Sequence, residues 1–257
     1  MSLSENIYRA AFPLLEGRTV TDLVVGISLM AVELDHKDIA VGYVLRDDLA
    51  GGCSIFPYAC KAVGMPAAEA ARWFVEGGDD VQRAIGGTVI NAASRALPLT
   101  DSGSREKPFD LELCPGERVG MVGMIRPVAM QLNKRGCDMV VFDKGKCAHG
   151  NPADHIYPME RQAELLPTCS AVFLSGTTTV NRTIEPLMNM CSKDADVVLV
   201  GSSVPMIPEG YTGTPVSILA GSWWDHKDKA EIFRLISQAA GMAVLGQYMI
   251  KKNVRIK

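Results

Sequence analysis

The chain has 257 residues, of which 47% are hydrophobic and 21% are charged, and its formal net charge at pH 7 is -3. This composition predicts a folded protein of one or two domains with a sizeable core, and it argues against extensive disorder. Because the sequence has no long basic run, we expect a small-molecule ligand and no nucleic-acid partner.

Targeting signals and metal-binding cysteine pairs are also missing from the sequence. No apolar run approaches the ~18 residues that a membrane-spanning helix needs, and the start MSLSENIYRA lacks the basic and apolar regions of a secretory signal. We therefore expect no membrane partner and a cytoplasmic location. The seven cysteines include no C-x-x-C pair, so we expect reduced thiols rather than disulfides or a zinc finger.

In the first half of the chain, strands precede helices. Val20 to Glu33 and Ile39 to Leu45 are rich in β-forming residues and predict an antiparallel pair joined by the turn LDHKD. Pro66 to Phe74 and Asp79 to Ala96 predict two helices, since proline opens the first and acidic residues open the second. We expect an α+β domain over residues 1–105.

A polar segment with two prolines, TDSGSREKPFDLELCPGE, follows and predicts a domain boundary. Beyond it, short apolar runs alternate with helix-length segments such as Ile125 to Lys134. This alternation predicts a parallel sheet with helices on both faces over residues 106–257. The predicted strands are Val119 to Val122, Cys137 to Phe142, Ser170 to Leu174, Val197 to Val200 and Val216 to Ala220.

Small or hydroxyl-bearing residues follow three of these strands, in GMVGM at 120–124, SGTTTVNRT at 175–183 and GSS at 201–203. In parallel sheets, ligands bind beyond the carboxyl ends of the strands, where the strand order reverses. Glycines and hydroxyls let a ligand approach the backbone closely. The three loops therefore predict a ligand cleft, and capping of a helix expected near Thr183 is the alternative role for Ser175, Thr177 and Thr178.

A nucleotide is a less favoured ligand. The turn GMVGMIRP lacks the G-x-G-x-x-G pattern, because Val122 and Ile125 stand at glycine positions. Asp143, however, ends a predicted strand about 20 residues beyond Gly123, where an acid often binds ribose hydroxyls. NAD or S-adenosylmethionine therefore stays open as an alternative to a metal chelate.

Several motifs carry a family resemblance: VGMVGMIRPV at 119–128, FDK at 142–144, LSGTTTVNRTIEPLM at 174–188 and VVLVGSSVPMIPE at 197–209. They resemble the "putative heavy-metal chelation" family, in which an enolase N-terminal-like domain precedes a Rossmann-like domain. Residues 64–95 resemble the helical part of the first domain. Members commonly have T-G-T-T-L-V-N-G-T, where this chain has Ser175, Thr179 and Arg182 in place of the first threonine, the leucine and the second glycine.

The resemblance implies an α/β fold and the binding or handling of a metal ion or small metal-chelating molecule in a cleft between the two domains. From the first domain we prefer Asn91, because an asparagine in a small, apolar helical face is costly unless its amide finds partners. Hydrogen bonds from the Asn91 amide to a neighbouring backbone, in place of a ligand, are an equally favoured alternative. The matching residues of the second domain are Gly123, Arg126, Pro127, Thr177, Thr178, Asn181, Ser202 and Ser203.

Direct metal binding by side chains is a separate hypothesis. The segment DKGKCAHGNPADH contains Cys147, His149 and His155, which can bind zinc, nickel or copper through sulfur and imidazole. Their spacing matches no standard structural site, so an ordinary solvated loop is the favoured alternative. A bound chelator could instead carry a transition metal while the protein recognises its organic part.

An enzyme that makes or breaks a metal-binding compound is the alternative function. A lyase, synthase or transferase would use Arg126 to hold an anionic substrate and Glu160 or Asp143 to move protons. The sequence has no G-x-S-x-G, Walker or H-E-x-x-H motif, and an exposed helix start is the commoner place for a residue like Glu160. The pair Trp223 and Trp224 predicts packing, a ligand wall or a dimer contact, and a homodimer is the default assembly.

Overall fold

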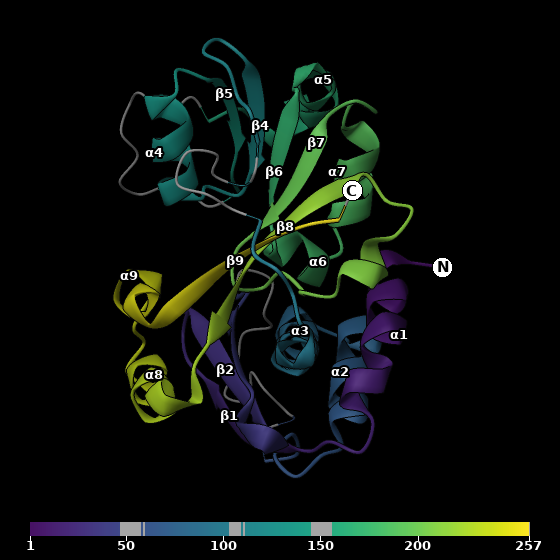
Figure 1. The fold of residues 1–257 in the computed structure, drawn as a ribbon, viewed down its shortest axis with the longest axis vertical. Coiled ribbons are helices and arrows are strands. Elements are labelled where there is room, and N and C mark those ends of the chain that lie inside the picture. The colour runs from purple at the N-terminus through teal and green to yellow at the C-terminus, as the bar shows by residue number, and fades with distance from the viewer. Residues whose placement is uncertain (47–57, 59, 103–108, 110, 145–155, 257) are drawn as a thin grey trace.

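One sheet runs through the whole molecule in the computed structural model (Figure 1), which describes residues 1–46, 58, 60–102, 109, 111–144 and 156–256. Its strand order is β1-β2-β3-β8-β7-β6-β4-β5, with β9 paired to β8. A single residue pair, Ile39 with Trp224, joins the first three strands to the rest. The predicted α/β class is confirmed, as a curled and largely parallel sheet covered by helices.

The first half contains an antiparallel sheet of three strands, β1 (Val20–Val25), β2 (Leu29–Leu34) and β3 (Ile39–Tyr43). The prediction of a single strand from Val20 to Glu33 was wrong, because the chain turns at Gly26, whose N–H donates to the carbonyl of Leu29. A side chain at Gly26 would clash with the carbonyl oxygen of Ile236. Glycine therefore lets the hairpin pack closely against the C-terminal part of the chain.

Helix α3 lies on one face of this sheet, α2 packs against α3, and α1 packs against α2 (Figure 1). Helices α2 (Ala67–Glu76) and α3 (Asp80–Ala93) agree with the two predicted helices, and the carboxylate of Asp79 accepts a hydrogen bond from the N–H of Gln82 at the start of α3. Helix α1 (Leu3–Leu15) was not predicted, and Ser2 and Glu5 form a capping box at its start. Helix α3 is buried along almost its entire length.

The second half contains five parallel strands, β4 (Arg118–Val122), β5 (Asp138–Phe142), β6 (Ala171–Ser175), β7 (Asp196–Val200) and β8 (Val216–Trp224). Helix α4 (Arg126–Lys134) lies on one face, and α5 (Gln162–Leu165) and α7 (Ile184–Met190) lie on the other (Figure 1). The short helix α6 (Thr177–Val180) follows the carboxyl end of β6.

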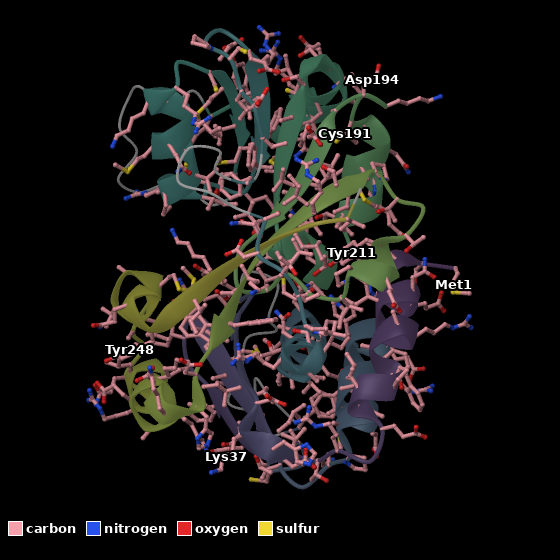
Figure 2. All side chains as sticks on the ribbon, in the orientation of Figure 1. Met1, Lys37, Cys191, Asp194, Tyr211 and Tyr248 are labelled. Atoms are coloured by element: carbon pink, nitrogen blue, oxygen red, sulfur yellow. The ribbon has the colours of Figure 1, made fainter. Side chains whose placement is uncertain are left out.

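The apolar core on the α5 and α7 face continues into the core of the first half, so the two halves share one cluster. Tyr211 is fully buried where they meet (Figure 2), and its hydroxyl donates to the carbonyl of Pro205 at 3.1 Å. The segment after β7 is therefore packed against the first half.

The C-terminal segment crosses back to the first half. Helices α8 (Lys229–Ser237) and α9 (Met242–Leu245) lie over the face of the antiparallel sheet that α3 does not cover, before β9 (Met249–Arg255) returns to pair with β8 (Figure 1). The apolar residues in this layer are Leu29, Ala31, Ile39 and Val41 with Trp224, Ile232, Ile236 and Leu245. Across the described ranges, no helix is both long and apolar enough to span a membrane.

Candidate functional site

The strand order reverses between β4 and β6, since the chain continues from β4 to β5 on one side and from β6 to β7 and β8 on the other. Gly123 follows β4 with φ +85°, a left-handed conformation that favours glycine. A Cβ atom there would lie 2.9 Å from Cβ of Ser175, the last residue of β6. Glycine is therefore required at this position, and the two strand ends touch at the reversal.

Polar groups gather beside this contact. The hydroxyls of Ser175 and Thr177 are 2.8 Å apart, and the carboxylate of Asp143, which follows β5, accepts a hydrogen bond of 2.5 Å from the N–H of Met124. Gly123, Asp143 and Thr177, which the sequence predicted separately, thus belong to one cluster. Arg126 and Pro127 begin α4 just beyond it, and both are exposed.

A second group joins the loop after β7 to the first half. The amide of Asn91 in α3 donates to the carbonyl of Ser202 and accepts from the N–H of Met206, both at 2.9 Å. The hydroxyl of Ser203 accepts from the N–H of Tyr43 at 2.9 Å. The polar atoms of Asn91 therefore bind backbone, which is the alternative that the sequence left open.

The hydroxyl of Ser202, unlike that of Ser203, is unpaired within the described ranges. Ser202 is only 2% exposed, and its Oγ has no hydrogen-bond partner among the residues that the structure describes. Buried polar groups are normally paired, so this lone hydroxyl is an exception that calls for an explanation.

Most side chains of the threonine loop (residues 175–183) hold the loop itself. The hydroxyls of Thr178 and Thr179 donate to the carbonyls of Ser175 and Gly176, each at 2.7 Å. The carboxamide oxygen of Asn181 accepts from the N–H and the hydroxyl of Thr183. The predicted helix starts at Ile184, and no side chain caps it. Thr178 and Asn181 thus shape the turn around α6.

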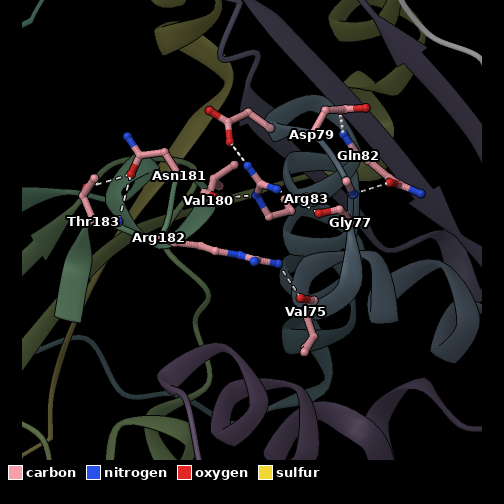
Figure 3. A network of polar contacts seen from close by, with 11 residues as sticks. Val75, Gly77, Asp79, Gln82, Arg83, Val180, Asn181, Arg182 and Thr183 are labelled. Atoms are coloured by element: carbon pink, nitrogen blue, oxygen red, sulfur yellow. Dashed lines mark hydrogen bonds and ion pairs between the residues drawn. The ribbon is translucent and has the colours of Figure 1, made fainter. Parts of the chain in front are cut away.

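Two arginines link this loop to the first half (Figure 3). Arg182 donates from Nη2 to the carbonyl of Val75 at 2.6 Å, and Arg83 donates from Nε to the carbonyl of Val180 at 2.8 Å. Arg182 has φ +61°, which explains why glycine is common at the matching family position. Sequence reasoning missed Arg83, which directly precedes the small and largely apolar stretch AIGGTVINAA.

The remaining predicted residues lie apart from these groups or outside the described chain. Glu160 is exposed in a short helical turn just before α5. Cys147, His149 and His155 lie outside the described residues. Within the described ranges, no three His, Cys, Asp or Glu side chains are grouped so that they could hold a metal ion.

One surface hollow of about 220 Å³ lies beside the threonine loop, between the start of α1, the end of α2 and the start of α7. Arg182, Glu185 and Glu5 are its charged lining residues. None of the predicted site residues lines this hollow, so it is distinct from the strand-end groups.

These features define a mixed α/β protein whose parallel strands end in glycine and hydroxyl loops at the reversal of strand order. Two family models match the chain, over residues 8–94 and 107–255, and both are described as "Putative heavy-metal chelation". The chain belongs to this family, as its motifs predicted.

Solved structures and a sequence relative agree with this membership. A protein of unknown function from the DUF364 family of Pyrococcus horikoshii has a TM-score of 0.77 at 19% identity, covering 99% of this chain and 100% of that one. A second, from Desulfitobacterium hafniense, has a TM-score of 0.73 at 20% identity, covering 98% of each chain. An uncharacterized protein of Methanocaldococcus jannaschii is 27% identical over 157 residues, and this match spans 60% of either protein.

Proposed function

We propose that the chain binds a small metal-chelating molecule, or its metal complex, at the carboxyl edge of β4, β6 and β7. On this proposal the site lies in a cleft between an enolase N-terminal-like domain (1–105) and a Rossmann-like domain (106–257). The family description supports the ligand class. The position supports the site, because ligands of parallel sheets bind where the strand order reverses.

The observation that carries the proposal is the contact between Gly123 and Ser175. It brings the loops after β4 and β6 together and places the paired hydroxyls of Ser175 and Thr177 at the reversal. Hydroxyl groups both donate and accept hydrogen bonds, so they suit the oxygen and nitrogen atoms of an organic chelator. The protein would then recognise the organic part, and the chelator would hold the metal.

The unpaired hydroxyl of Ser202 supports a second contact point at the end of β7. Leaving a buried hydroxyl unpaired costs about 1–3 kcal/mol. A ligand atom that bonded to it would recover part of this cost, and Asn91 and Tyr43 hold the loop that carries it. On this proposal Asn91 positions the site through the backbone of Ser202.

The test is elemental analysis and native mass spectrometry of protein purified without chelators and without air. We expect a metal, or an extra small-molecule mass, that is lost from the double variant S175A/T177A. The matched control is T168A/S170A, which removes two hydroxyls near the amino end of the same strand and should keep the ligand.

Three results would contradict the proposal. One is a ligand that both double variants retain equally. The other is a metal that survives S175A/T177A but disappears when Cys147, His149 and His155 are all replaced by alanine, because the metal would then sit on protein side chains. Finding neither metal nor additional mass in the wild type would also count against chelate binding.

A further inference from the structure

Two cations lie against one indole ring at the point where β8 extends beyond β7. The guanidinium carbon of Arg95 is 4.7 Å from the centroid of the Trp223 ring, and Nζ of Lys252 is 4.6 Å from it. Arg95 comes from the turn after α3, and Lys252 comes from β9, diagonally across from Trp223. Two separate elements therefore place a cation against the side chain of a third, β8.

The indole N–H of Trp223 lacks an acceptor. Its Nε1 is buried and has no hydrogen-bond partner among the residues that the structure describes. The neighbouring Trp224, by contrast, is packed in the core, and its Nε1 donates to the hydroxyl of Ser222 at 3.2 Å. Because an indole nitrogen can only donate, any group that satisfies Trp223 must supply an acceptor.

The carboxylate paired with Arg95 is not enough to balance these donors. Asp225 lies 3.5 Å from Nη2 of Arg95 and 3.6 Å from Nζ of Lys227, and its side chain is 37% exposed. Both distances are longer than a good charge-assisted hydrogen bond. A solvent-exposed pair of this kind contributes little. Arg95, Lys252 and the indole N–H together therefore present more donors than the structure gives them acceptors.

We propose that Trp223, Arg95 and Lys252 form a binding site for a compact anionic group, the carboxylate or phosphate of a small molecule. Arginine can grip such a group with two N–H donors, while lysine adds a point charge. The indole N–H supplies a third, uncharged donor.

This anion site is close to the strand-end groups but does not depend on them. Gly221 and Trp223 point to the same face of β8, because side chains alternate along a strand, and Gly221 packs on Met206. Met206 in turn bonds to Asn91, which lies one helical turn before Arg95. The site therefore lies beside the bond between α3 and the loop after β7, and it can be tested whether or not a chelate binds at the strand ends.

The test uses the full chain with ¹⁵N-labelled tryptophan. The chain has three tryptophans, so its indole region in a ¹H–¹⁵N spectrum contains three signals, and W223F identifies that of Trp223. We expect inorganic phosphate or acetate, titrated against chloride at constant ionic strength, to shift the Trp223 signal to saturation. The signals of Trp73 and Trp224 should stay in place and so report an intact fold.

Charge variants give the decisive comparison. The double variant R95Q/K252Q should weaken anion binding by about tenfold or more, because it removes two charged donors. D225N should tighten it, because it removes the competing carboxylate. If phosphate binds with the lower dissociation constant, the site is assigned to phosphoryl ligands. If acetate binds with the lower dissociation constant, it is assigned to carboxylates.

The proposal is overturned if millimolar phosphate and acetate both leave the Trp223 signal unmoved or shift it no more than chloride does. It is equally overturned if R95Q/K252Q, with the Trp73 and Trp224 signals in place, binds the anion as tightly as the wild type. In that case the anion acts at another part of the surface.

Discussion

Nη2 of Arg182 donates a hydrogen bond of 2.6 Å to the carbonyl oxygen of Val75, near the last turn of α2 (Figure 3). The cation thus meets the end of the helix where carbonyl groups lack partners inside the helix, which favours positive charge. Arg182 holds this position from a left-handed backbone conformation. One residue therefore combines a favourable contact with an unfavourable φ angle.

Replacing Arg182 by glycine and by alanine should separate these two effects. R182A loses the bond to Val75 and keeps the strained backbone, so we expect a loss of about 1 kcal/mol in the free energy of unfolding. R182G loses the same bond but relieves the left-handed strain, which is worth roughly 1–2 kcal/mol, so it should be close to wild type. Urea unfolding measures both, and equal losses would show that the φ angle costs nothing.

Asn91 should be far more important for stability than Asn181. N91A leaves the buried carbonyl of Ser202 and the N–H of Met206 without their partner, which should cost on the order of 3 kcal/mol. N181A removes only local bonds to Thr183 in a half-buried turn, so about 1 kcal/mol or less is expected. Urea unfolding measures both losses. If N91A and N181A lose similar free energies of unfolding, the prediction is wrong.

Glu33 should make stability depend on pH in acid. Burial alone would raise the pKa of Glu33, but hydrogen bonds from Lys229, Thr21 and His226 outweigh it and hold the pKa below the ordinary 4.5. A carboxyl whose pKa is lower in the folded state stabilises the fold above its unfolded pKa, and this contribution is lost as the pH falls through the folded pKa. E33Q should therefore be less stable than wild type at neutral pH.

The difference in stability between E33Q and wild type should decrease steadily below about pH 4.5. Thermal unfolding from pH 7 to pH 3 measures it. E231Q is the matched control, because Glu231 also bonds to a cation of α8, but its side chain is 41% exposed against 10% for Glu33. The stability difference between E231Q and wild type at neutral pH should therefore be much smaller. If the stability difference between E33Q and wild type does not change with pH, the lowered pKa of Glu33 is contradicted.

Cys169, which is buried, and Cys191, which is partly buried, should resist alkylation. Burial raises the pKa of the Cys169 thiol and of the Cys191 thiol to about 11; Cys191 is labelled in Figure 2. At pH 8 only about a thousandth of such a thiol is the reactive thiolate. Cys60 and Cys114 are exposed, so iodoacetamide followed by peptide mass spectrometry should label them first. Early labelling of Cys169 in folded protein would be the contrary result.

Local patterns predicted much of the fold, while long-range contacts decided the rest. The parallel strands and the helices α2, α3 and α4 appear close to their predicted limits, because apolar runs and helix starts are local signals. The turn at Gly26 was missed because its reason lies more than 200 residues away, at Ile236. In the same way, the partners of Asn91 are 111 and 115 residues distant.

The candidate site shows the same division. The sequence located glycine and hydroxyl loops at strand ends, and the structure joins Gly123, Asp143 and Thr177 in one cluster. Which hydroxyls close the turn and which stay unpaired depends on backbone geometry that the residue types do not encode. The hydroxyls of Thr178 and Thr179 donate to the carbonyls three residues before them, whereas the hydroxyl of Ser202 has no partner in the described chain.

The layer formed by α8 and α9 has a consequence for how the protein is made. The apolar face with Leu29 and Val41 is synthesised early, but the helices that cover it are complete only at Leu245. At about 5–20 residues per second, a ribosome needs roughly 10–40 s to add the intervening stretch. During that time the apolar face of the nascent sheet stays uncovered and can aggregate. Slow translation lengthens this period, and chaperones that bind at the ribosome can shield the face.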